Sequence, residues 1–201
     1  MGPSGIGKST LASVLCGAIE PDGGKVSLGG TPLHRLEPGA LRRSVVLVPQ
    51  EAYLFRGSVR DNLSYHRDDH PDDMTITGAV TAVGAQELLS SLGGLGAELL
   101  PRTLSAGERQ LLVLARVYLG SAEVVVLDEA TCHLDETTEA RAEQAFRSRG
   151  CTLVVIAHRI SSARRAQRVL VLDGTGVRDG SHAALVANSD TYAELVGHWS
   201  T

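Results

Sequence analysis

Apolar residues follow two patterns along this chain, and together they predict strands that alternate with helices. Short, nearly continuous runs rich in Val, Ile and Leu are typical of strands buried in a parallel sheet; they occupy residues 44–48, 124–127 and 151–156. Apolar residues that recur every three or four positions predict amphipathic helices, here at residues 8–19, 107–119, 136–147 and 160–165. The alternation predicts an α/β fold with a mostly parallel sheet covered by helices on both faces.

Weaker patterns flank this core. A short strand is expected at residues 25–28, before a Gly-Gly pair. Towards the other end of the chain, residues 168–172 and 176–178 are expected to pair as strands. Two helices are expected to follow, at residues 182–187 and 191–198.

The middle of the chain has a different character. Residues 58–100 show no strong strand pattern, and their apolar residues indicate short helices on either side of an acidic loop at residues 67–73. We therefore expect one domain over residues 1–201 with two parts. These are an α/β core, residues 1–50 and 110–201, and an inserted α-helical subdomain, residues 51–109.

The composition narrows the classes of protein that remain. A length of 201 residues suits one ordinary domain, and a net charge of −4 gives no sign of a nucleic-acid partner. No apolar run approaches the roughly 20 residues of a membrane-spanning helix, so work at a membrane would require a partner that spans it. The three cysteines, at positions 16, 132 and 151, show no metal-binding spacing.

The first ten residues carry the pattern with the clearest chemistry. Gly2, Gly7, Lys8 and Ser9 fit the phosphate-loop spacing. Glycines let the backbone approach an anion, and the N–H groups of the loop and of the next helix then point at phosphate oxygens. Lys8 would reach the β- and γ-phosphates, and the Ser9 hydroxyl would hold Mg²⁺. The predicted nucleotide-binding residues here are Gly2, Pro3, Ser4, Gly5, Ile6, Gly7, Lys8, Ser9 and Thr10. The alternative is a glycine-rich turn before a helix.

Two acids follow the apolar strand at residues 124–127. Ligands of parallel sheets bind at the carboxyl ends of the strands, which is where Asp128 and Glu129 are expected. Asp128 would hold Mg²⁺, and Glu129 could polarise the water that attacks the γ-phosphate. The alternative is that the two acids simply open a loop.

Further motifs make the chain resemble the ATP-binding cassette (ABC) family. Residues 104–110, Leu-Ser-Ala-Gly-Glu-Arg-Gln, resemble the family's signature motif, and residues 48–50 resemble its Q-loop. Leu134 and Asp135 resemble its D-loop, and His158 resembles its switch histidine. The motifs stand in the family's order over residues 2–158. Residues 50–62 are most similar to the exporter class.

The resemblance implies further roles. Gln50 would meet Mg²⁺ or the attacking water, and His158 would bond the γ-phosphate and orient the water of Glu129. Ser105, Ala106, Gly107 and Glu108 would serve a nucleotide bound to a second nucleotide-binding domain, and Asp135 would connect the two sites. Taken alone, Ser105 could be a plain helix cap, and Gln50 and His158 could be structural. The implied ligands are ATP and Mg²⁺, and the implied partner is a transmembrane domain, which would hold the chain at the cytoplasmic face of the membrane.

The chain also departs from the family's pattern. Ala106 stands where the family usually has Gly, which could alter nucleotide affinity or rate. In the family, strands and an adenine-stacking aromatic residue precede the phosphate loop, so we expect that this sequence lacks its N-terminal strands and that these residues alone are poorly stable and weakly active. Two other functions stay open: a soluble ABC ATPase of DNA repair or chromosome maintenance, and a nucleotide-binding module without turnover.

Overall fold

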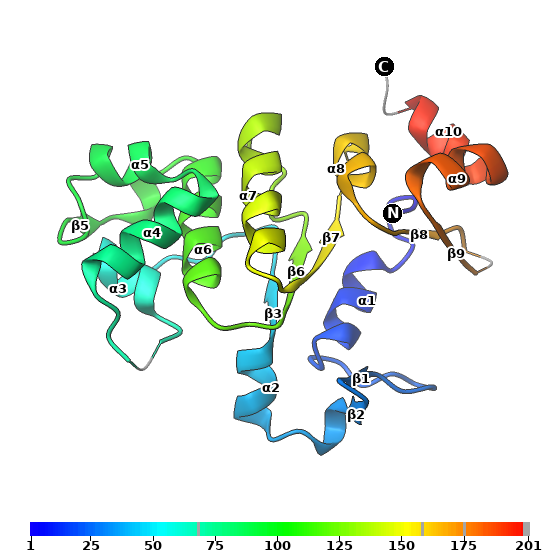
Figure 1. The fold of residues 1–201 in the computed structure, drawn as a ribbon, viewed down its shortest axis with the longest axis horizontal. Helices are drawn as coiled ribbons and strands as arrows, with labels where there is room; N and C mark the ends of the chain where they lie inside the picture. Colours follow the sequence, from blue (N-terminus) through cyan, green and yellow to red (C-terminus); the bar gives the residue numbers. More distant parts are fainter. Residues whose placement is uncertain (68, 158, 175, 199–201) are drawn as a thin grey trace.

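A three-stranded parallel sheet forms the centre of the molecule (Figure 1). The structure, a computed structural model, describes residues 1–67, 69–157, 159–174 and 176–198. The strands β3 (Val45–Val48), β6 (Val124–Asp128) and β7 (Thr152–Ile156) lie in the order β3-β6-β7. In register, Val45 lies opposite Val124, which lies opposite Thr152. The three predicted core strands are confirmed.

Alternate residues of β6 point to opposite faces of the sheet, and helices pack against the apolar residues on both faces. On one face, Val126 packs with Ala12 of α1 (Lys8–Leu15). On the other, Val125 and Leu127 belong to a cluster with residues of α6 (Ala106–Leu119) and α7 (Glu136–Ser148). The predicted α/β fold with a parallel sheet is therefore confirmed.

The helix α1 is shorter than its apolar pattern predicts. It ends at Leu15 because the N–H groups of Gly17 and Ala18 turn back to the Val14 and Ser13 carbonyls, at 3.1 and 2.9 Å. Ile19, the expected last residue, is 47% exposed. The prediction was wrong in length because an apolar residue beyond the last turn can continue the spacing without being helical.

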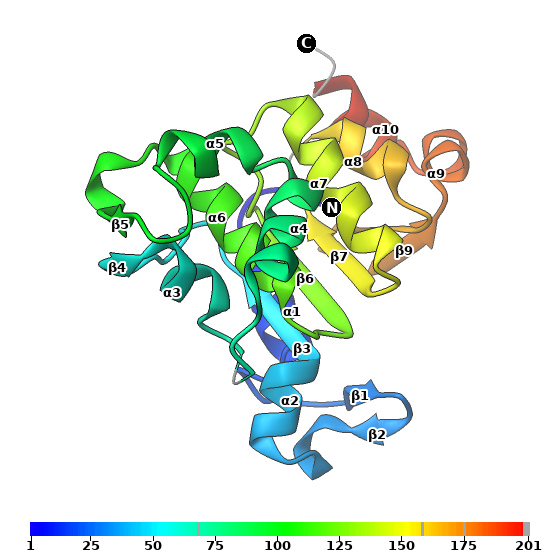
Figure 2. The ribbon, with the colours of Figure 1, turned by 60° about the vertical axis from the view of Figure 1, so that its left-hand side comes forward.

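One end of the sheet carries a hairpin and a helix (Figure 2). The strands β1 (Ser27–Leu28) and β2 (Thr31–Pro32) pair antiparallel, and η1 (Leu33–Arg35) follows. The helix α2 (Pro38–Ser44) was not predicted. It begins after Glu37, whose carboxylate accepts from the Gly39 and Ala40 N–H groups, each at 2.7 Å.

The middle of the chain is mainly helical, as expected, and lies to one side of the sheet (Figure 1). It contains α3 (Val59–Ser64), α4 (Asp73–Val83), α5 (Gln86–Ser91) and η2 (Pro101–Thr103). Two short strands, β4 (Gly57–Ser58) and β5 (Glu98–Leu99), pair antiparallel and close this region. Two residues carry no detectable alternation, so these strands could not be predicted.

The last part of the chain lies on the other side of the sheet (Figure 1). It holds α8 (Ile160–Arg165), the antiparallel strands β8 (Val169–Leu172) and β9 (Val177–Gly180), α9 (His182–Asn188) and α10 (Asp190–His198). The backbone of Met1 pairs with β8: its nitrogen donates to the Leu170 carbonyl at 2.6 Å, and its carbonyl accepts from the Leu172 N–H at 2.9 Å. Over the described residues, no helix combines the length and apolar character needed to cross a membrane.

Candidate active site

The phosphate-loop residues are held between β8 and α1. Met1 pairs with β8 at the start of the loop, and α1 begins at Lys8 after it. Ala12 of α1 packs with Val126 in the middle of β6 and with Ile156, the last residue of β7. This packing brings the start of α1 towards the edge of the sheet where α/β proteins bind ligands.

The loop has the backbone shape that its glycines permit. Gly7 precedes α1 with φ +98°, in the left-handed region that other residues rarely adopt. The Lys8 side chain is buried, and its Nζ donates to the carbonyls of Gly2 and Pro3 at 2.9 and 2.8 Å. Ser9 and Thr10 are exposed at the start of α1. The lysine therefore closes the loop on itself, and a phosphate would compete for the same ammonium group.

Asp128 and Glu129 lie where the sequence places them, at the end of β6. One carboxylate oxygen of Asp128, Oδ1, is buried and accepts no hydrogen bond from the described residues. Glu129 has φ +54°, a left-handed conformation that is rare outside glycine and often marks functional sites. Its N–H donates to the Ile156 carbonyl at 3.1 Å, which ties the turn to β7.

The oxygen ligands of this region fit Mg²⁺. A buried acceptor without a donor is costly unless a cation or water satisfies it, and no donor of the described residues reaches the buried Asp128 Oδ1. Mg²⁺ prefers carboxylate and hydroxyl oxygens, the groups that Asp128 and Ser9 carry. The residues present are therefore compatible with a magnesium nucleotide.

Gln50 lies beside the loop that follows β6. Its Nε2 contacts the Cys132 Sγ at 3.8 Å. Gln110 of α6 reaches the same place: its Nε2 donates to the Gln50 carbonyl at 3.2 Å and to the Cys132 Sγ at 3.5 Å. Its Oε1 accepts from the His133 N–H at 3.1 Å. Sequence reasoning did not single out Gln110, although a polar residue on the buried face of the helix that carries the signature motif was a usable signal.

The signature residues begin α6. Ser105 caps the helix: its hydroxyl accepts from the Glu108 N–H at 3.2 Å, and its own N–H donates to the Glu108 carboxylate at 2.7 Å. The Ser105 N–H, which donates to the carboxylate, is the largest cause that lowers the pKa of Glu108, and a side-chain hydrogen bond with Ser105 is the second cause. Ala106 and Gly107 form the first turn. Ser105 therefore acts as a helix cap in this structure. The role of Ser105, Ala106, Gly107 and Glu108 towards a nucleotide stays a prediction.

The D-loop residue Asp135 caps α7. Its Oδ1 accepts from the Thr137 and Thr138 N–H groups, each at 3.0 Å, and its Oδ2 accepts from the Thr138 hydroxyl at 2.5 Å. The hydroxyl bond first, and then the backbone bonds, lower the pKa of Asp135. Its role between two sites stays a prediction. The predicted switch histidine, His158, lies outside the described residues.

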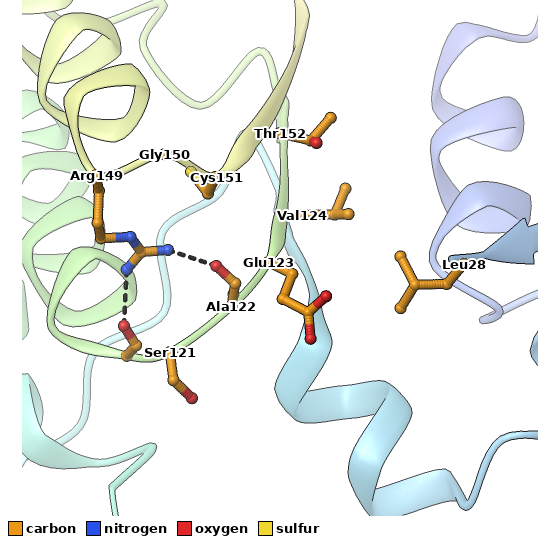
Figure 3. Close-up of a pocket in the computed structure, with 10 residues that line it drawn as sticks. Leu28, Ser121, Ala122, Glu123, Val124, Arg149, Gly150, Cys151 and Thr152 are labelled. Carbon is orange, nitrogen blue, oxygen red and sulfur yellow. Dashed lines mark hydrogen bonds between the residues drawn. The ribbon is translucent and has the colours of Figure 1, made fainter. Parts of the chain in front are cut away.

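A cavity of about 480 Å³ lies elsewhere, at the amino ends of β6 and β7 (Figure 3). Arg149 lines it and donates to the Gly120 and Ala122 carbonyls, each at 2.7 Å. The guanidinium therefore satisfies backbone groups just beyond the C-terminal end of α6. Because parallel sheets bind ligands at their carboxyl ends, we place the candidate site at Asp128 instead.

Comparison with known proteins decides the family. Residues 1–132 match the family described as ABC transporter. The chain belongs to the ABC transporter family. The matched residues of this ABC chain include the phosphate loop, Gln50, the signature motif and the Asp128–Glu129 pair.

Relatives of this ABC chain agree with the exporter resemblance. The ABC transporter ATP-binding protein RamB of Streptomyces coelicolor is 50% identical over 201 residues, which are 100% of this chain and 33% of RamB. The ATP-dependent lipid A-core flippase of Alcanivorax borkumensis is 36% identical over 97% of this chain and 34% of the flippase. The solved structure of a bacterial Atm1-family ABC exporter with ATP bound matches with a TM-score of 0.91 at 30% identity, over 100% of this chain and 36% of that chain. This chain thus spans about a third of the length of these relatives.

Proposed function

We propose that this chain binds ATP with Mg²⁺ and hydrolyses it, and that hydrolysis powers export through a membrane-spanning partner. The family match supports ATP binding, and the names of the relatives, a transporter ATP-binding protein and an ATP-dependent flippase, support a role in transport. The chain would work at the cytoplasmic face of a membrane. Its core would be residues 1–50 and 110–201, and its helical subdomain residues 51–109.

One observation carries the cation site. The buried Oδ1 of Asp128 accepts no hydrogen bond from the described residues, although a buried charged acceptor is costly to leave unsatisfied. Asp128, with the Ser9 hydroxyl and the Gln50 amide, would hold Mg²⁺, which neutralises phosphate charge when bound. Lys8, which now donates to its own loop, would transfer those bonds to the β- and γ-phosphates.

The turn after β6 suits a general base. Glu129 follows Asp128 directly in a strained left-handed conformation, which re-aims the chain at the strand end. Its carboxylate would accept a proton from the water that attacks the γ-phosphorus, while the bond to the departing ADP oxygen breaks. Gln50 and His158 would orient that water.

A second nucleotide-binding domain completes the proposal. The residues Ser105–Glu108 open α6, and the positive end of a helix dipole attracts anions. We assign them to the nucleotide held by the partner domain, with Asp135 linking the two sites. A two-fold axis would supply each of two composite sites with one phosphate loop and one signature motif.

The test uses the two lysines of the chain. Lys8 is buried at the end of the phosphate loop, and Lys25 is exposed just before β1, which makes Lys25→Ala a matched control for Lys8→Ala. We expect Lys8→Ala to lower the rate of Mg²⁺-dependent phosphate release about tenfold or more, because it removes a charge from the transferring phosphate, and Lys25→Ala to leave it unchanged. Equal rates in the two variants would contradict the proposal. Tight ATP binding without phosphate release in the unaltered protein would favour a module without turnover.

A further inference from the structure

The side chain of Gln110 joins three segments that the proposed function places around the nucleotide. It is 2% exposed, although it is polar and lies on the buried face of α6. Its amide donates to the Gln50 carbonyl at 3.2 Å and to the Cys132 Sγ at 3.5 Å, and its carbonyl accepts from the His133 N–H at 3.1 Å. A single buried amide therefore binds the backbone of the Q-loop to the backbone of the loop after β6.

A second contact, one turn earlier on α6, brings the same surfaces together. A side chain at Gly107 would place its Cβ 2.8 Å from the His133 carbonyl oxygen. That distance is too short for a real Cβ, so the start of α6 approaches residue 133 as closely as glycine allows. Residue 133 is thus held from both sides, by Gln110 at its N–H and by close packing of Gly107 at its carbonyl.

Hydrogen bonds continue from this point to the predicted general base. The Cys132 N–H donates to the Glu129 carbonyl at 3.1 Å, and the Leu134 N–H donates to the Thr131 carbonyl at 3.0 Å. These bonds close the tight turn that Glu129 opens with its left-handed backbone. The position of the Glu129 backbone therefore depends on the loop that Gln110 holds.

We propose that Gln110 is a positioning residue, which fixes the Gln50 loop and residues 129–134 against the signature helix and so sets the rate of hydrolysis. This inference rests on the proposed function. Gln110 acts through Gln50 and Glu129, because its amide groups are already used by the protein backbone and the cysteine. Without it, the two loops lose their common anchor, and misplacement of a reacting group by about 1 Å can cost on the order of 100-fold in rate.

The test compares Gln110→Met with Gln144→Met. Methionine keeps the length of the side chain and removes the amide, so the Gln50 carbonyl and the His133 N–H lose their bonds to Gln110. Gln144 is exposed on α7 and serves as the control. The measurements are hydrogen exchange of the segment 129–135, ATP binding, and the kcat and KM of ATP hydrolysis.

We expect faster exchange of residues 129–135 in Gln110→Met, a kcat about tenfold or more lower, and an ATP Kd within about twofold of the unaltered protein. Gln144→Met should change none of these. Unchanged exchange, or faster exchange with an unchanged kcat, would overturn the inference, as would a loss of ATP binding in proportion to kcat. If the unaltered protein does not hydrolyse ATP, the proposed function fails, and the exchange measurement still decides whether Gln110 holds the two loops.

Discussion

Replacing Glu143 by glutamine should lower the stability of the protein markedly. Glu143 is fully buried on α7 and joins that helix to α8. Its carboxylate accepts from the Ser162 hydroxyl at 2.6 Å, from Arg165 Nε at 2.9 Å and from Arg147 Nη2 at 3.1 Å. Glu139, one turn earlier, is also buried and pairs with Arg165 at 3.1 Å. The substitution keeps the volume and removes one of the two charges that balance the guanidinium groups.

The expected size of the effect follows from the exposure of the partners. Removing one member of a fully buried ion pair costs about 3–5 kcal/mol. The side chains of Arg165 and Arg147 are 23% and 29% exposed, so water partly replaces the lost carboxylate. We therefore expect a loss of about 2–3 kcal/mol, which for a domain of this size lowers Tm by about 4–12 °C.

Thermal unfolding followed by circular dichroism at pH 7 measures this shift. The matched control is Glu20→Gln, because Glu20 is exposed in a loop and the same charge is removed. The control should change Tm by less than about 2 °C. A Glu143→Gln shift no larger than that of the control would refute the reasoning, since the buried carboxylate would then contribute nothing that an amide cannot.

Three further predictions concern the site and its support. Asp128→Asn should raise the Tm of the ligand-free protein by about 2–4 °C, because it removes the charge of a carboxylate whose buried Oδ1 accepts no hydrogen bond from the described residues. It should also abolish the further rise on adding Mg²⁺ and ATP; a lower Tm without ligand would contradict the prediction. Arg149→Met should lower Tm by about 4–8 °C, since a cation that satisfies backbone carbonyls near the end of α6 is lost; an unchanged Tm would contradict it. Mixing Lys8→Ala chains with Ser105→Arg chains should restore ATPase activity above that of either variant, because one composite site per mixed dimer stays intact; mixed dimers that form and stay inactive would count against composite sites.

The core strands could be predicted because burial on both faces leaves a mark in the sequence itself. The Val and Leu residues of β3 and β6 form continuous apolar runs, and the parallel orientation of the strands follows from their alternation with helices. The strands β4 and β5 are two residues long and could not be predicted. The helix α2 depends on one capping carboxylate, Glu37, rather than on an apolar face.

The candidate site could be predicted only in part, because motifs name residues and not their partners. The positions of Lys8 and Asp128 follow from local spacing along the chain. The contacts of Gln110 do not, because its partner Gln50 lies 60 positions away and meets it only once α6 packs on the loop after β6. The burial of Glu139 and Glu143 could not be predicted either, because charged residues on a helix usually indicate a face exposed to solvent.

The most direct test of the proposed activity separates ATP binding from ATP hydrolysis at Glu129. The unaltered protein should bind ATP with Mg²⁺ and release phosphate over many turnovers. Glu129→Gln keeps the shape of the side chain and removes the base, so it should bind ATP as tightly and lose phosphate release about 100-fold or more. Glu123→Gln, just before the start of β6, is the control and should leave both unchanged. Phosphate release by Glu129→Gln at a rate near that of the control would contradict the account.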